Sequence, residues 1–126
     1  MTKENPPKLT RKNLPQEVKL SVKASQDKKA EDIIVLDLRD VSSFTDFFVI
    51  VTGNSTRQNT AIYESIEQEL KKGRLMQIGV EGRNLAEWIL IDYGSFVVHV
   101  FSKQARGYYS LEKLWGDAPR LSYAGH

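Results

Sequence analysis

Residues 45–58 read TDFFVIVTGNSTRQ and contain the most clearly specified local structure of the chain. Five consecutive residues, 47–51, are aromatic or β-branched, and no polar residue interrupts them. A run of this kind is typical of a strand that is buried on both faces rather than half exposed at an edge. The sequence therefore predicts a central strand here, around which the other elements of one sheet are arranged.

A polar turn and the start of a helix follow this predicted strand. Thr52, Gly53 and Asn54 end the apolar run, and Ser55 stands three residues before Gln58, as in a capping box. A strand, a glycine turn and a helix N-terminus can also hold an anion, because free N–H groups and the helix dipole point in one direction. The glycine spacing does not match that of a phosphate loop, however. We therefore interpret the turn as a corner of the fold and keep nucleotide binding at Gly53-Asn54-Ser55 as the alternative.

The pattern of hydrophobic residues along the chain predicts three helices and five strands. Helices are expected over residues 15–29, from the capping box to residue 72 and from residue 102 to residue 115, and strands at residues 33–39, 47–51, 75–80, 88–92 and 96–101. This order predicts one α/β (α+β) domain with a five-stranded mixed sheet and helices on both of its faces. The domain is expected over residues 15–117, between a flexible basic tail at 1–14 and an exposed tail at 118–126.

The last two predicted strands form a β-hairpin. A two-residue loop at Tyr93-Gly94 and a four-residue loop at residues 92–95 give the same register. In that register Trp88 lies opposite His99 on one face of the hairpin.

Composition and charge restrict the classes of function. No apolar run approaches the roughly 20 residues that cross a bilayer, and the absence of cysteine excludes disulfides and thiolate metal sites. We expect a cytoplasmic protein without membrane contact. Residues 1–31 carry eight basic and four acidic side chains, whereas the remaining 95 residues carry ten basic and twelve acidic ones. The folded part is therefore slightly acidic, which favours a basic protein partner over nucleic acid.

Catalytic residues and cofactors are not expected. The only histidines are His99 and His126, too few for a dedicated metal site or for an oriented catalytic triad. Two-metal nucleotidyl transfer requires a pair of carboxylates, but the strand predicted at residues 75–80 contains none and Asp92 is a single acid.

Large aromatic residues and cations gather in the predicted hairpin and in the helix after it, and such residues are the usual anchors of protein interfaces. Tyr108, Leu111 and Trp115 also fit the buried stripe of the last helix, so both interpretations stay open there. On the hairpin, Ile89 and Ile91 already supply a core face, which leaves the opposite face for a partner. We expect a partner-binding surface made of Trp88, His99, Phe101, Arg106, Tyr109, Lys113 and Trp115.

Three blocks carry a resemblance to a known family. They read AEDIIVLDLRDVSSFTDFFVIVTGNSTRQ, GVEGRNLAEWILIDYGSFVVHVF and ARGYYSLEKLWGDAP, and they occur in one order across residues 14–119. Together they strongly resemble the ribosomal silencing factor family, also called the Iojap or RsfS family.

The resemblance implies a binding factor and not an enzyme. Members of this family bind the large ribosomal subunit at its L-fourteen protein and hinder joining of the small subunit, which lowers translation when nutrients are scarce or helps subunit assembly in organelles. Their fold is similar to that of nucleotidyltransferases without the catalytic carboxylates, and homodimers are typical. The family pattern is silent on the basic tail at residues 1–13, which either makes a weak contact with ribosomal RNA or is inert.

Overall fold

The structure is a computed structural model in which residues 9–123 are described, so most of the predicted N-terminal tail lies outside the described residues. The elements are α1 (Gln16–Asp27), β1 (Glu31–Asp37), β2 (Phe47–Gly53), α2 (Thr56–Lys72), β3 (Gly79–Glu81), β4 (Trp88–Asp92), β5 (Phe96–Ser102), α3 (Lys103–Tyr109), α4 (Leu111–Leu114) and β6 (Arg120–Ser122).

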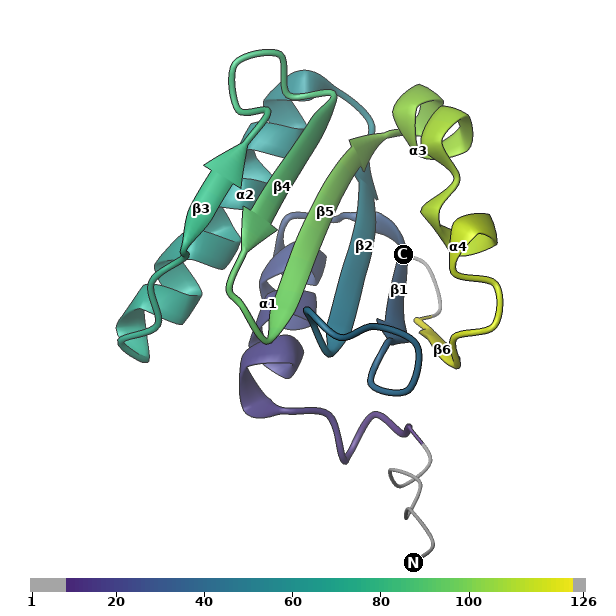
Figure 1. Ribbon diagram of the computed structural model, residues 1–126. Helices are drawn as coiled ribbons and strands as arrows, with labels where there is room; N and C mark the ends of the chain where they lie inside the picture. The colour runs from purple at the N-terminus through teal and green to yellow at the C-terminus, as the bar shows by residue number, and fades with distance from the viewer. Residues whose placement is uncertain (1–8, 124–126) are drawn as a thin grey trace, which may run out of the picture.

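The strands form one mixed sheet in the order β3-β4-β5-β2-β1-β6, which Figure 1 shows from left to right. β2 and β5 run parallel, and every other neighbouring pair is antiparallel. All seven residues of β2 are buried, and this strand lies between β5 and β1 in the interior of the sheet. The predictions of a mixed α/β fold and of a central strand at this position are therefore confirmed.

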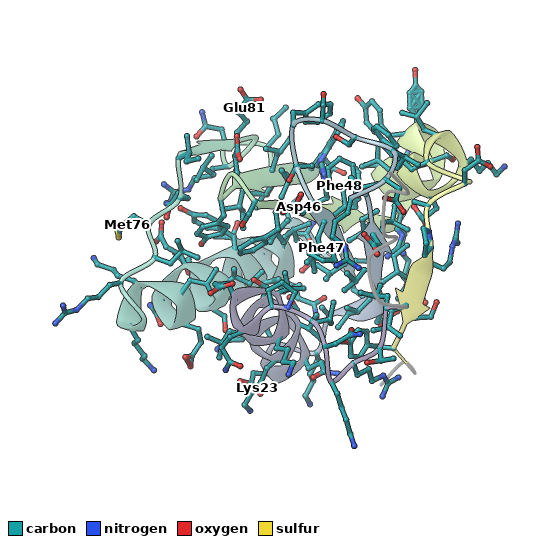
Figure 2. The ribbon with its side chains drawn as sticks, turned by 60° about the horizontal axis from the view of Figure 1, so that its bottom comes forward. Lys23, Asp46, Phe47, Phe48, Met76 and Glu81 are labelled. Carbon is teal, nitrogen blue, oxygen red and sulfur yellow. The ribbon has the colours of Figure 1, made fainter. Side chains whose placement is uncertain are left out.

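Helices pack against both faces of the sheet. α1 and α2 lie together behind it in Figure 1, whereas α3 and α4 lie beside β2 and β1. Successive side chains of a strand point to opposite faces, so β2 contributes to two separate cores. Phe47 belongs to the core under α1 and α2, and Phe48, labelled beside it in Figure 2, belongs to the core under α3 and α4.

The sheet has a sixth strand where the sequence analysis expected an exposed tail. β6 pairs with β1, the N–H of Asp37 donates to the carbonyl of Pro119 at 2.8 Å, and Ala118 is buried. A three-residue strand with Leu121 as its one apolar residue is too short to show a periodicity. Its formation depends on the open edge of β1, which only the tertiary structure supplies. The expected five strands are therefore corrected to six.

Two other elements are shorter than predicted. The strand expected at residues 75–80 is reduced to the three residues of β3 at the left edge in Figure 1. The last helix is divided into α3 and α4 because Ser110 adopts a left-handed conformation with φ of 47°. A non-glycine residue in this conformation interrupts an α-helix.

The register of the β4–β5 hairpin also differs from the prediction. Trp88 pairs with Phe101 rather than with His99. The turn is centred one residue later than expected, with φ of +86° at Gly94, a value that glycine adopts without strain. The shift amounts to two residues, so the same side chains still share one face.

The turn after β2 is a corner held by its own side chains. Ser55 Oγ accepts from the N–H of Gln58 at 3.0 Å, and Gln58 Oε1 accepts from the N–H of Asn54 at 2.6 Å. The predicted capping box is therefore present, with Asn54 as the second backbone donor. The side-chain nitrogen Nε2 of Gln58 also donates to the carbonyls of Lys28 and Lys29, which connects the start of α2 to the end of α1.

Gly53 is required at this corner because the side chain of Asn59 occupies the space of a Cβ atom. Asn59 is fully buried and donates from Nδ2 to the carbonyl of Ala86 at 2.8 Å, so it cannot move away freely. We expect Gly53→Ala to lower the free energy of unfolding by about 1–3 kcal/mol through overpacking, measured by urea denaturation. The matched control is Gly107→Ala in α3, where a Cβ meets nothing within 4 Å; it should keep or slightly raise stability. Equal stability of the Gly53→Ala variant and the parent would contradict this account.

Candidate functional site

An aromatic cluster joins β2, β4, β5 and the two helices that follow β5. The ring of Trp88 lies 4.5 Å from that of Tyr109 between centroids. Phe48 presents an edge-on contact to His99 at 4.4 Å and to Trp115 at 6.0 Å. The fold therefore brings together most of the aromatic residues that the sequence predicts for a partner-binding surface, and adds Phe48 to them.

Exposure divides this predicted set. His99 is 3% exposed and Phe101 0%, because α3 and α4 cover the part of the sheet that the sequence analysis left open for a partner. The expectation that these two side chains are exposed was wrong. Trp88 and Trp115 are half-buried, and Tyr109 is 50% exposed. Among the aromatic members of the set, accessible surface therefore remains on Trp88, Tyr109 and Trp115.

The structure shows which of Tyr108, Leu111 and Trp115 are buried and which are exposed. Leu111 is buried in α4, and Trp115, directly after this helix, is half-buried against the same core. Tyr108 is 76% exposed and belongs to the surface. Leu114 is 72% exposed, and the sequence analysis did not include it among the surface residues. The break at Ser110 interrupts the helical periodicity, so the spacing of residues before the break does not predict which residues of α4 are exposed.

The centre of the cluster is a hydrogen bond between two side chains. The indole N–H of Trp88 donates to Nδ1 of His99 at 3.0 Å. Nδ1 accepts only when it carries no proton, so neutral His99 holds its proton on Nε2. Nε2 has no hydrogen-bond partner among the described residues, and burial lowers the pKa of His99 to about 3. The pair orients the half-buried indole ring and stays uncharged at neutral pH.

The two predicted cations lie apart from the aromatic rings. Nε of Arg106 donates to Glu112 at 3.2 Å, and Nη1 donates to the carbonyl of Asp32 and to Oγ1 of Thr52, so its guanidinium is held inside the protein. Lys113 is exposed on α4. Arg106 and Lys113 line the same hollow, which contains no aromatic side chain among its described lining residues.

The glycine turn after β2 has few free groups to offer an anion. The N–H groups of Asn54 and Gln58 already donate within the capping box. The side-chain amide of Asn54 donates to Glu31 at 2.8 Å, and Lys103 lies 3.6 Å from the other oxygen of that carboxylate. The hydrogen bond from Asn54, followed by the charge of Lys103, lowers the pKa of Glu31. A carboxylate at this turn repels a phosphate, so the geometry agrees with a corner of the fold.

Acidic side chains do not converge elsewhere in the described chain. Within residues 9–123, no three His, Cys, Asp or Glu side chains are grouped so that they could hold a metal ion. β3 ends in one exposed carboxylate, Glu81, rather than in the pair that two-metal chemistry requires. Across the same residues, no helix has the length and apolar character that a membrane span needs.

The fold and the site together define a small mixed α/β domain with an aromatic surface supported by a buried histidine. A family model described as "Ribosomal silencing factor during starvation" matches residues 11–125. The ribosomal silencing factor RsfS of Bacillus subtilis is 45% identical over 102 residues, which are 81% of this chain and 86% of that protein. The chain belongs to the ribosomal silencing factor family.

Further relatives extend this comparison to organelles and to solved structures. A mouse protein named mitochondrial assembly of ribosomal large subunit protein 1 is 30% identical over 102 residues, covering 79% of this chain and 45% of that protein. A crystal structure of a Chromobacterium violaceum protein aligns with a TM-score of 0.78 and 38% identity, covering 87% of this chain and 92% of that one. The sequence resemblance to the family is thereby confirmed, and the curated bacterial relatives carry the name of a regulatory factor.

The buried His99 makes stability depend on pH. In the unfolded chain its imidazole takes up a proton near pH 6.5, whereas in the folded protein it does so only near pH 3. Its contribution is therefore fully present above pH 6.5 and is lost as the pH falls, by about 2 kcal/mol between pH 6.5 and 5. We expect urea denaturation at pH 7 and pH 5 to show a loss for the parent that is about 2 kcal/mol larger than for His99→Gln, which keeps an acceptor for Trp88 but does not titrate. Equal losses in the two proteins would show that burial of His99 does not control this dependence.

Proposed function

We propose that this protein binds the large ribosomal subunit through the L-fourteen protein of that subunit and blocks association with the small subunit, which represses translation. The observation that carries the proposal is membership of the ribosomal silencing factor family across residues 11–125. The name of the mouse relative, which refers to assembly of the ribosomal large subunit, supports the same subunit as the partner. The proposed site of action is the cytoplasm.

The proposed contact surface consists of the accessible part of the aromatic cluster. Tyr108, Tyr109 and Leu114 are exposed on α3 and α4, and Trp115 is half-buried directly after α4. Trp88 lies beside Tyr109, and His99 holds its ring. Half-exposed aromatic side chains in a fixed orientation bind a partner with little loss of conformational entropy. Residues 32–126 carry two more acidic than basic side chains, which suits a basic ribosomal protein.

Buried residues of the predicted set support this surface from below. Phe101 and His99 lie under Trp88, and Arg106 connects α3 to the backbone of β1 through Asp32. In the proposal these side chains set the position of the contact residues and do not touch the ribosome themselves. Repression then follows from steric exclusion, since a protein bound to the joining face of one subunit occupies the space of the other.

Homodimer formation stays a prediction from the family resemblance, and sedimentation equilibrium of the purified chain tests it. RNA contact by the basic residues before position 14 also stays a prediction, because that segment lies mostly outside the described residues.

Co-sedimentation with isolated large subunits tests the proposal. We expect the parent to bind and Trp88→Ala and Tyr109→Ala each to weaken binding at least tenfold, the effect of losing an anchor worth more than about 1.4 kcal/mol. Met76→Ala is the matched control, because Met76 is about as exposed as Tyr109 but lies in the segment between α2 and β3 (Figure 2). The parent should also slow subunit joining, followed by light scattering. Absence of binding by the parent, or equal binding by all three folded variants, would refute the proposed surface.

A further inference from the structure

α3, α4 and the first residue of β6 surround a hollow of about 510 Å³. Four charged residues line it, namely Arg106, Glu112, Lys113 and Arg120. They come from positions spread over the last quarter of the sequence, where basic and acidic residues alternate without a visible cluster. The local charge at this place is therefore a property of the fold, and the net charge of the chain does not reveal it.

The charges of the hollow do not cancel. Arg106 and Glu112 neutralise each other at 3.2 Å, and both side chains are mostly buried. Lys113 has no ion-pair partner in residues 9–123, and Arg120 donates only to the backbone carbonyl of Glu112 at 3.3 Å. Asp117, the other acid of this segment, is exposed and makes no ion pair within the described residues. Two cations, Lys113 and Arg120, are thus left without a carboxylate.

The remaining lining is small and polar. Gly107 and Gly116 leave the backbone accessible, and Ser110 contributes a hydroxyl that now donates to the carbonyl of Gly107 at 2.6 Å. The volume lies within the range of about 300–1,000 Å³ that small-molecule pockets have. A guanidinium fork and a flexible ammonium on a shared hollow are the groups that bind phosphate in proteins.

We propose that this hollow binds a phosphate group, carried either by a free nucleotide or by an RNA strand, between Lys113 and Arg120. The hollow borders the aromatic surface without including it, because none of its described lining residues is aromatic, and it takes in Lys113 of the predicted partner-binding set. None of its described lining residues comes from the glycine turn after β2, where the N–H groups of Asn54 and Gln58 already donate within the capping box. The inference goes beyond the proposed function and does not depend on it.

NMR titration of the full chain tests this site with three probes: inorganic phosphate, adenosine monophosphate and a short single-stranded RNA. We expect the amide signals of residues 106–120 to shift in a saturable way with at least one phosphate ester. Arg120→Gln and Lys113→Gln should each weaken that binding about tenfold, which corresponds to the loss of one charged hydrogen bond. Lys23→Gln is the matched control, because Lys23 is an exposed cation on α1, away from α4 in Figure 2.

The probes also distinguish the sources of the phosphate. Saturation by the mononucleotide at an affinity equal to that of RNA identifies a nucleotide site. Binding of RNA alone, with an affinity that falls steeply as salt rises, identifies the phosphate backbone of a strand. Absence of shifts at residues 106–120 with every probe, or binding unchanged in the Lys113→Gln, Arg120→Gln double variant, overturns the proposal. The amide spectra show in the same experiment whether each variant is folded.

Co-sedimentation of the Arg120→Gln variant with large subunits tests separately whether phosphate binding and subunit binding use the same residue. Loss of phosphate binding together with normal subunit binding supports a phosphate site on a surface that the subunit contact does not need. Normal phosphate binding by the Arg120→Gln variant contradicts the site, whatever the subunit experiment shows.

Discussion

The complete burial of β2 is the constraint on which the rest of the structure depends. A strand with Phe47, Val49 and Val51 on one side and Phe48 and Ile50 on the other loses its hydrophobic stabilisation unless both sides are covered. α1 and α2 cover the first side as a packed pair. The second side is covered by α3 and α4, which are short, and this explains why a half-open aromatic surface remains beside them.

The same constraint shows how far the sequence predicted the structure. The central strand, the corner after it and α2 follow from local patterns: an unbroken apolar run, a capping box and a ladder of Ile62, Ile66 and Leu70. The burial of His99 and Phe101 does not follow from such patterns, because it depends on α3 folding back over β5 and β2. The strand β6 depends in the same way on a distant edge. Local features were therefore predictable, whereas features created by packing between remote segments were not.

The candidate surfaces differ in the same respect. Trp88 and Tyr109 are recognisable in the sequence as large aromatic residues, and the structure brings their rings to 4.5 Å from each other. The cationic hollow has no sequence signature, because its residues are separated by neutral and acidic neighbours and meet only where α3, α4 and β6 converge. The neutral imidazole of His99 lies between the rings of Trp88 and Phe48, so the aromatic surface carries no charge at its centre. The hollow, in contrast, is lined by charged side chains.

The pairing of β6 with β1 also determines when the domain can complete its folding during synthesis. Ile34 in β1 pairs with Ser122 in β6, which is made 88 residues later, and this pair lies at the outer edge of the sheet. The parallel neighbour of β2 is likewise β5, which is made long after it. Contacts between such remote segments form late because the loop between them must first close. A nascent chain of this protein therefore reaches its final sheet only after residue 122 has left the ribosome that makes it.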